Sequence, residues 1–199
     1  MIRQFILLFL IIFITNVYSK DIEQLVYFEK PEEAVRAFET LTINLLKMSN
    51  AEPKSQRFIY ALSQIENLFD FKTIGALILG KHAENKNEDL EFEFIEELRN
   101  LTARTMVTNY INYSGQKYKT IKITRTEKRA FIFTEFYISD NETMPFRFVL
   151  KNNEGNWKII NIIASGVSEL SVKKIEYQSF LETKTLSELI QEIKRKNQI

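Results

Sequence analysis

The period of the hydrophobic pattern changes near Gly115, and this change limits the possible folds of the 199-residue chain more than any other feature. Before Gly115, apolar residues recur every three or four positions, as along one side of a helix. After it, they alternate with polar residues or run together, and many are β-branched or aromatic, which is typical of strands. Near residue 168 the helical period returns. Helices, then consecutive strands, then helices again predict an α+β fold.

The helical part before Gly115 contains clear start and stop signals. Pro31 and Pro53 suit first helical positions, and Asp70 can cap a third, short helix that ends at Gly80 in a left-handed conformation. The fourth helix is the longest, starts at Asn87 or Glu88 and ends at Ser114 and Gly115. The expected helices cover residues 31–48, 53–69, 70–79 and 87–114. One side of the longest helix carries apolar and small residues: Leu90, Phe94, Leu98, Leu101, Thr105 and Tyr110.

Four strands follow, and the second is apolar on both faces, which indicates a central position. Their expected ranges are 118–124, 128–138, 144–152 and 157–164. The composition of residues 151–156 is that of a hairpin turn. Alternation places Phe146, Phe148 and Leu150 on one face of the third strand. We therefore expect an NTF2-like fold: a curved antiparallel sheet of about four strands packed with a helical layer, a helical extension in the N-terminal half and two C-terminal helices.

The first 19 residues have the pattern of a secretory signal peptide, with Arg3, an apolar run over residues 5–14 and a cleavage site after Ser19. The apolar run is shorter than the roughly 20 residues that a membrane-spanning helix needs. We expect cleavage there, which leaves residues 20–199 as a single domain. Cysteine is absent from the sequence, so this domain has no disulfide and no lipoprotein anchor.

Charge and residue types exclude several function classes. Loss of Arg3 with the signal peptide reduces the 27 Lys and Arg to 26, equal to the 26 Asp and Glu, so nucleic acid is not the expected partner. His82 is the sole histidine, and we interpret it as a surface residue. Glu135 and Tyr137 share one face of a strand, but packing and an outward position explain them. We expect no catalytic residue, no metal and no cofactor.

Three blocks in fixed order resemble the MlaC (toluene-tolerance) family of periplasmic phospholipid-binding proteins. The first runs over residues 69–81 and ends in a Leu-Gly turn. The second covers residues 92–122, with the step Gly-Gln-Lys-Tyr at 115–118. The third covers residues 155–197, with Gly-Asn-Trp at 155–157 and Ile-Ile-Ala-Ser-Gly-Val-Ser at 162–168. The match is looser over residues 20–60 and 124–150.

The resemblance implies a non-enzymatic lipid carrier that holds phospholipid acyl chains in an internal apolar cavity and leaves the head group near solvent. It implies a monomer in the periplasm of a Gram-negative bacterium. The implied partners are phospholipid, an inner-membrane ABC transporter complex with an MlaD-like subunit, and an outer-membrane lipoprotein complex with an MlaA-like subunit. The implied role is lipid transport that maintains outer-membrane lipid asymmetry, as an auxiliary component of the transporter.

The resemblance also suggests which residues contact lipid. The sequence pattern alone favours a solid core over a lipid cavity for these apolar side chains. The resemblance reverses this preference for the group as a whole, and it then favours a lipid cavity. The expected lipid-binding residues are Ile74, Leu77, Ile78, Ile121, Ile123, Phe133, Phe146, Phe148, Leu150, Val167 and Leu170. Two alternatives remain: a carrier of another hydrophobic ligand, hopanoid-like or isoprenoid, and a protein-only adaptor. Two acyl chains need a cavity in the upper part of the range of about 300–1,000 Å³.

Overall fold

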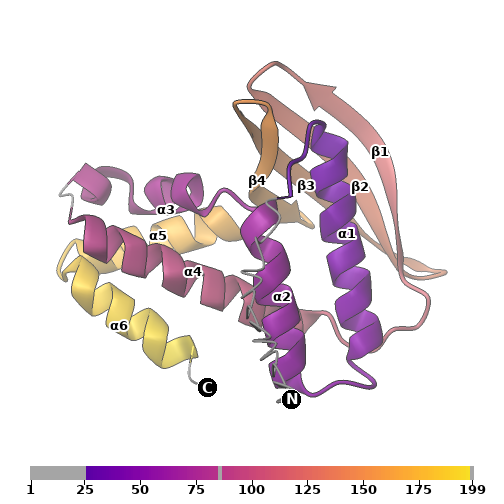
Figure 1. Ribbon diagram of the computed structural model, residues 1–199, viewed down its shortest axis with the longest axis horizontal. Coiled ribbons are helices and arrows are strands. Elements are labelled where there is room, and N and C mark those ends of the chain that lie inside the picture. The colour runs from indigo at the N-terminus through magenta and orange to yellow at the C-terminus, as the bar shows by residue number, and fades with distance from the viewer. Residues whose placement is uncertain (1–25, 85–86, 198–199) are drawn as a thin grey trace, which may run out of the picture.

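Helices precede and follow a sheet in the computed structural model, which describes residues 26–84 and 87–197 (Figure 1). The expected signal peptide at residues 1–19 lies outside these ranges. The helices of the N-terminal half are α1 (Pro31–Met48), α2 (Lys54–Leu68), α3 (Phe71–Leu79), the 3₁₀ turn η1 (Gly80–Glu84) and α4 (Glu88–Asn109). The strands are β1 (Lys117–Arg125), β2 (Arg129–Ser139), β3 (Glu142–Asn153), β4 (Asn156–Ala164) and β5 (Val167–Ser168). The C-terminal helices are α5 (Glu169–Leu181) and α6 (Leu186–Asn197).

Helix starts follow the chemistry of their capping residues. The Asp70 carboxylate accepts a hydrogen bond from the Thr73 backbone N–H at 2.9 Å. Asn87 caps α4 in the same way, and Ser168 caps α5. Each cap satisfies an N–H group that has no partner within its own helix. At the other end of α3, Gly80 has φ +56° and ψ −124°. The positive φ suits glycine, but ψ lies outside the left-handed helical region, so the predicted left-handed conformation is wrong.

Helix α4 ends earlier than the sequence predicts, at Asn109 instead of Ser114. The buried guanidinium of Arg57, on α2, donates hydrogen bonds to the carbonyls of Val107 (2.6 Å) and Tyr110 (3.0 Å). These carbonyls would otherwise lack partners at a helix C-terminus. A side chain from a different helix therefore fixes this end, and no local pattern could reveal it.

The strands form one antiparallel sheet in the order β1-β2-β3-β4-β5. The predicted strands all appear within two residues of their expected ends. The two-residue β5 is additional, and it pairs with β4 because Ser165 and Gly166 turn the chain back with positive φ. Alternation along β3 buries Phe146, Phe148 and Leu150 and leaves Arg147 exposed, as predicted.

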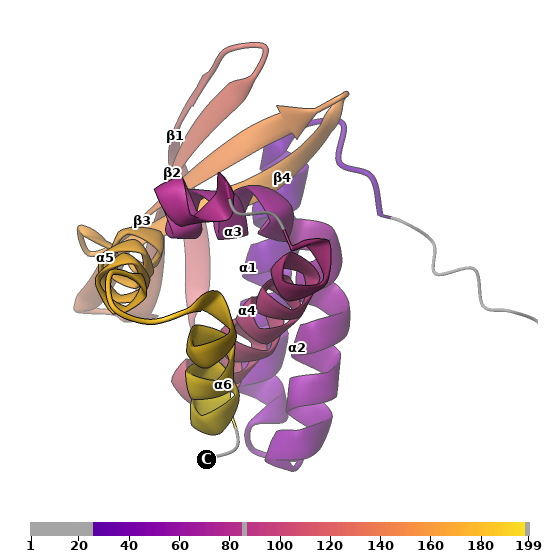
Figure 2. The same ribbon diagram turned by 90° about the vertical axis from the view of Figure 1, so that its left-hand side faces the viewer.

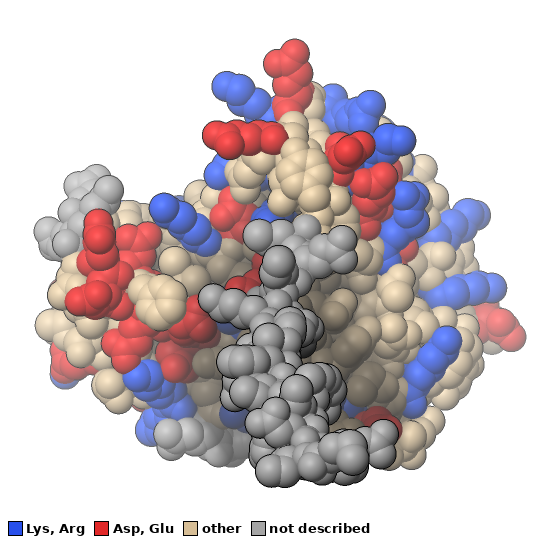
Figure 3. Space-filling model, in the orientation of Figure 1, with Lys and Arg blue, Asp and Glu red and all other residues tan. Residues whose placement is uncertain are grey.

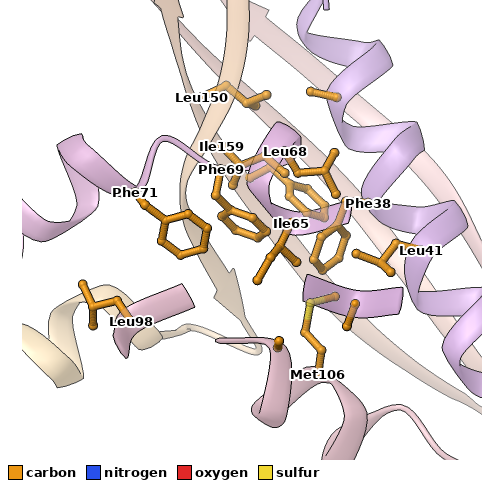
Figure 4. Close-up of a cluster of buried hydrophobic side chains, with 14 of the residues drawn as sticks. Phe38, Leu41, Ile65, Leu68, Phe69, Phe71, Leu98, Met106, Leu150 and Ile159 are labelled. Carbon is orange, nitrogen blue, oxygen red and sulfur yellow. The ribbon is translucent and has the colours of Figure 1, made fainter. Parts of the chain in front are cut away.

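The helices lie mostly on one side of the sheet (Figure 2). Helix α1 lies across it, with the Phe38 and Phe148 rings edge to face at 5.1 Å between centroids. Figure 4 shows the adjoining core, in which Phe38, Ile65 and Phe69 lie together beneath the strands. Helix α5 packs on α3, and α6 packs on α4. The predicted α+β class and curved antiparallel sheet with a helical layer are confirmed, with a short fifth strand added.

Candidate functional site

An apolar cavity of about 300 Å³ lies where α3, α4 and α5 meet the end of the sheet formed by β3, β4 and β5. Its wall is mostly aliphatic and aromatic. The apolar residues that line it are Phe38, Phe69, Phe71, Ile74, Ile78, Leu98, Leu101, Met106, Tyr110, Phe146, Ile160, Ile162, Ala164, Val167 and Leu170. Its volume is at the lower end of the range for ligand pockets.

Helical and strand periods bring these side chains together. Ile74 and Ile78 are four residues apart on α3, so they lie on one face of the helix. Leu98 and Leu101 lie on one face of α4 in the same way. On the sheet side, the β3–β4 register shifts, and the additional residue on β4 is Ile160, which is buried in the cavity wall. Such a bulge redirects a side chain toward one face.

The polar groups around the cavity are few. They are Thr102, Thr105, Asn109, Asn161, Glu169 and Lys173. Lys173 Nζ lies 3.1 Å from Glu176 Oε2, and the side-chain Oδ1 of Asn161 accepts a hydrogen bond from the Ser168 hydroxyl. Apolar walls with few polar groups are typical of a site for a hydrophobic ligand.

Tyr110 lines the cavity at the end of α4, next to the half-buried Tyr118 of β1. Burial raises the pKa of Tyr110 to about 12, although a hydrogen bond with Tyr118 opposes the shift. Burial also raises the pKa of Tyr118. Both phenols therefore stay neutral near pH 7. A neutral phenol can donate a hydrogen bond but cannot act as a general base.

The structure brings some of the expected lipid-binding residues to this cavity and not others. Five of them line it: Ile74, Ile78, Phe146, Val167 and Leu170. Phe148 and Leu150 lie on the same face of β3 as Phe146, but both are fully buried in the solid core. Helix α1 covers this part of β3, as the contact between Phe38 and Phe148 shows. Strand alternation gives the face of a residue but not what covers that face.

The other expected residues lie outside the cavity. Leu77, on α3, is 37% exposed. Ile121 and Ile123 belong to the edge strand β1, where they are 52% and 41% exposed. Phe133 points away from the helices, since its neighbours Ile132 and Thr134 are the buried ones. Contact of any expected residue with lipid stays a prediction.

Several cavity residues were not among the expected ones. Leu98, Leu101 and Thr105 come from the apolar side of the longest helix, which the sequence pattern does reveal. Phe69 and Phe71 flank the Asp70 cap, where they have no helical period to mark them. The sequence pattern shows which side of α4 faces the interior of the protein. It does not show that a cavity separates this side from the sheet.

A second cavity, of about 510 Å³, lies on the other side of Phe69 and Phe71, which line both cavities. Its other walls are mainly charged and come from α2, α3, α4 and β4. They include Glu66, Asp70, Lys72, Arg99 and Lys158. Arg99 is already paired with Glu66 at 2.7 Å and with Glu96 at 2.6 Å. The charged side chains make this space less suited to an acyl chain than the first cavity, because some methylene groups would contact hydrated charges.

The remaining candidate residues lie away from the apolar cavity. Tyr137 donates a hydrogen bond to Glu135 at 2.9 Å on the face of the sheet that points away from the helices. His82 Nε2 lies 3.7 Å from a Glu182 carboxylate oxygen beside η1. Over residues 26–84 and 87–197, no group of three or more His, Cys, Asp and Glu could hold a metal ion. In the same part of the chain, no helix combines the length and the apolar character needed to span a bilayer.

Comparisons with known proteins identify the family of the chain. No curated protein matches it. Among solved structures, it is similar to the phospholipid-binding protein from Ralstonia solanacearum, which was determined in complex with a phospholipid. The TM-score is 0.70 at 13% sequence identity, and the match covers 84% of this chain and 97% of that one. The sequence profile of the MlaC protein family matches residues 37–195. This chain therefore belongs to the MlaC family.

Proposed function

We propose that this protein is a lipid carrier that binds phospholipid by enclosing acyl chain in the apolar cavity between α3, α4, α5 and the sheet. The observation that carries the proposal is the cavity itself, with a wall that is mostly aliphatic and aromatic. Membership of the MlaC family and the phospholipid-bound neighbour of the same fold support it. We expect the protein to act by binding and not by catalysis, because Tyr110 in the cavity wall is neutral near pH 7 and Lys173 is paired with Glu176.

The energetics of transfer explain why a carrier of this kind is useful. Each methylene group removed from water contributes about 0.8 kcal/mol, so a sixteen-carbon chain gains roughly 12 kcal/mol. A free lipid therefore does not leave a membrane unaided at a useful rate. A cavity about as apolar as the bilayer makes the exchange nearly neutral in free energy, so the carrier itself needs no energy source.

The volume of the cavity limits how lipid is held. At about 300 Å³, the cavity falls below what two acyl chains need. Its walls include half-buried side chains from separate helices, such as Ile74, Leu101 and Leu170. We infer that α3, α4 and α5 move away from the sheet when a phospholipid with two chains enters. The head group then stays outside the apolar wall.

We place this activity in the periplasm, reached through the signal peptide at residues 1–19, with residues 20–199 as one monomeric carrier domain. In that setting the protein would move phospholipid between an inner-membrane ABC transporter complex and an outer-membrane lipoprotein complex of the Mla type. A hopanoid-like or isoprenoid ligand would suit the same apolar wall. A protein-only adaptor is less well supported, since an adaptor has no need of an apolar cavity.

The experiment compares two substitutions on α5 that differ only in position. Leu170→Glu places a carboxylate in the cavity wall, whereas Ile175→Glu places one on the same helix at a side chain that is 73% exposed. An unpaired carboxylate costs several kcal/mol when lipid removes it from water. Leu170→Glu should therefore lower phospholipid loading at least about tenfold, while Ile175→Glu leaves it unchanged.

Native mass spectrometry of protein purified from a bacterial periplasm measures the loading, and thermal denaturation of the same samples checks that each variant is folded. The unaltered protein should carry phospholipid. A folded, unaltered protein without any bound lipid would refute the carrier proposal. A bound mass that corresponds to a polycyclic or isoprenoid lipid would show that the ligand is such a lipid and not phospholipid. Equal loading of both variants would show that the lipid binds outside the apolar cavity.

A further inference from the structure

The face of the sheet that points away from the helices combines aromatic side chains with unpaired positive charge. On β2, Ile132 and Thr134 are buried toward the helices, so Phe131 and Phe133 point the other way. Phe131 is 38% exposed, and Phe133 is half-buried. Lys122 on β1 and Arg147 on β3 pair with Phe133 from either side in the strand register. We call this surface, together with Lys117 and Lys119, the outer face.

The positive charge of this region is not neutralised locally. From Lys117 to Ser139, β1, β2 and the turn between them carry six Lys and Arg against two Glu. None of these six side chains, nor Arg147, forms an ion pair with any residue that the structure describes. Of the two acidic residues, Glu135 accepts the hydrogen bond of Tyr137. The outer face therefore presents cations that are available to a partner.

The charge asymmetry extends across the molecule, although the whole chain has a formal net charge of only +1. Helix α4 carries six Asp and Glu against two Arg. Figure 3 shows Asp and Glu gathered on the side of α3 and α4, and Lys and Arg along the opposite side, where β1 forms the edge of the sheet. A field of this kind orients the protein with its β1 side toward a negative surface.

Protection of an edge strand explains only part of this pattern. Lysines on an exposed edge such as β1 prevent pairing with strands of other molecules. Arg147, however, belongs to β3, which has neighbours on both sides, and Phe131 belongs to β2, which also lies inside the sheet. A cation and an exposed aromatic side chain on interior strands suit a partner that offers both negative charge and an apolar layer.

We propose that the outer face docks reversibly on the surface of an anionic phospholipid bilayer. The lysines and Arg147 approach the phosphate groups, and Phe131 reaches the boundary between head groups and acyl chains. Lipid head groups are mobile, so they can match the spacing that the strands impose on these cations. The docking surface uses residues outside the apolar cavity, and it does not depend on lipid being held there.

The test is sedimentation of the full protein with vesicles of phosphatidylethanolamine containing phosphatidylglycerol, at low salt and at about 0.15 M salt. The outer-face variant combines Lys119→Gln, Lys122→Gln and Arg147→Gln. Each cation near an anionic surface strengthens binding about fivefold, so the three substitutions together should weaken vesicle binding about 100-fold. The control variant changes the net charge by the same amount at three exposed lysines outside the outer face. Its substitutions are Lys54→Gln, Lys72→Gln and Lys174→Gln.

The proposal expects binding that weakens with added salt, is absent on neutral phosphatidylcholine vesicles and is retained by the control. Leu170→Glu should bind vesicles as the unaltered protein does, which separates docking from lipid uptake. Equal losses in the outer-face and control variants would overturn the proposal, because net charge alone would then explain binding. Failure to bind anionic vesicles at low salt would also overturn it, and binding to soluble polyglutamate instead would assign the face to an acidic protein.

Discussion

Asp70 connects the start of α3 to the β3–β4 hairpin, although the sequence presents it only as a helix cap. Besides the Thr73 backbone N–H, its carboxylate accepts hydrogen bonds from the Thr73 hydroxyl (2.6 Å), Asn153 Nδ2 (2.9 Å) and Lys151 Nζ (3.3 Å). Burial alone would raise the pKa of Asp70, but these hydrogen bonds and the Lys151 charge outweigh it and lower the pKa to about 2. The charged form is therefore part of the folded structure.

Replacement of this carboxylate should give a stability change that depends on pH. Asp70→Asn keeps the size of the side chain and removes its charge, so at pH 7 it should lower the free energy of unfolding by about 2 kcal/mol. Because the folded pKa is lower than the ordinary value of 3.8, the contribution is present above pH 3.8 and disappears as the pH falls toward 2. Urea denaturation of both proteins from pH 7 to pH 3 measures this. A difference that is independent of pH would show that the charge is not responsible.

At the scale of elements, α3 and α5 are joined where the Gln178 side chain of α5 lies close to Gly80 at the end of α3. Gln178 of α5 donates a hydrogen bond from Nε2 to the Ile78 carbonyl at 2.9 Å. A Cβ atom on Gly80 would lie 2.4 Å from Gln178 Nε2, and the residue also has a positive φ. Because α3 and α5 are two walls of the apolar cavity, this junction fixes their spacing.

We expect Gly80→Ala to destabilise the protein more than the same substitution at Gly166. Gly166 also has a positive φ, of +80°, but a Cβ atom added there would have no other atom within 4 Å, so substitution at Gly166 measures backbone strain alone. That strain costs on the order of 1 kcal/mol, and displacement of Gln178 adds to it only at Gly80. Chemical denaturation gives both values. If the two substitutions cost the same, Gln178 moves aside freely and does not fix the junction.

The elements could largely be predicted from the sequence because their signals are local. Asp70, Asn87 and Ser168 each cap a helix through their own neighbours, and alternation along β3 assigns Phe148 to the inner face. The early end of α4 could not be predicted, because Arg57 reaches it from another helix. The cavity residues were predicted in part for a related reason. Phe146 and Phe148 have the same pattern in sequence, and only the position of α1 makes one a cavity residue and the other solid core.

At the scale of the whole molecule, the two surfaces of the sheet have different roles in our account. The inner surface packs against helices and borders the apolar cavity at the end formed by β3, β4 and β5. The outer face carries the exposed Phe131, the half-buried Phe133 and cations. A carrier of this design can approach a lipid surface through one side of the sheet and hold acyl chain on the other.

Photolabelling tests whether an acyl chain occupies the cavity between α3, α4, α5 and the sheet. The protein is loaded with a phosphatidylethanolamine that carries a diazirine on one acyl chain, irradiated, digested and analysed by mass spectrometry. We expect adducts on peptides that contain Ile78, Leu101 and Leu170, which line the cavity from three different helices. Bound lipid whose adducts lie on the outer face, around Phe131 and Phe133, with none on these helices, would contradict it.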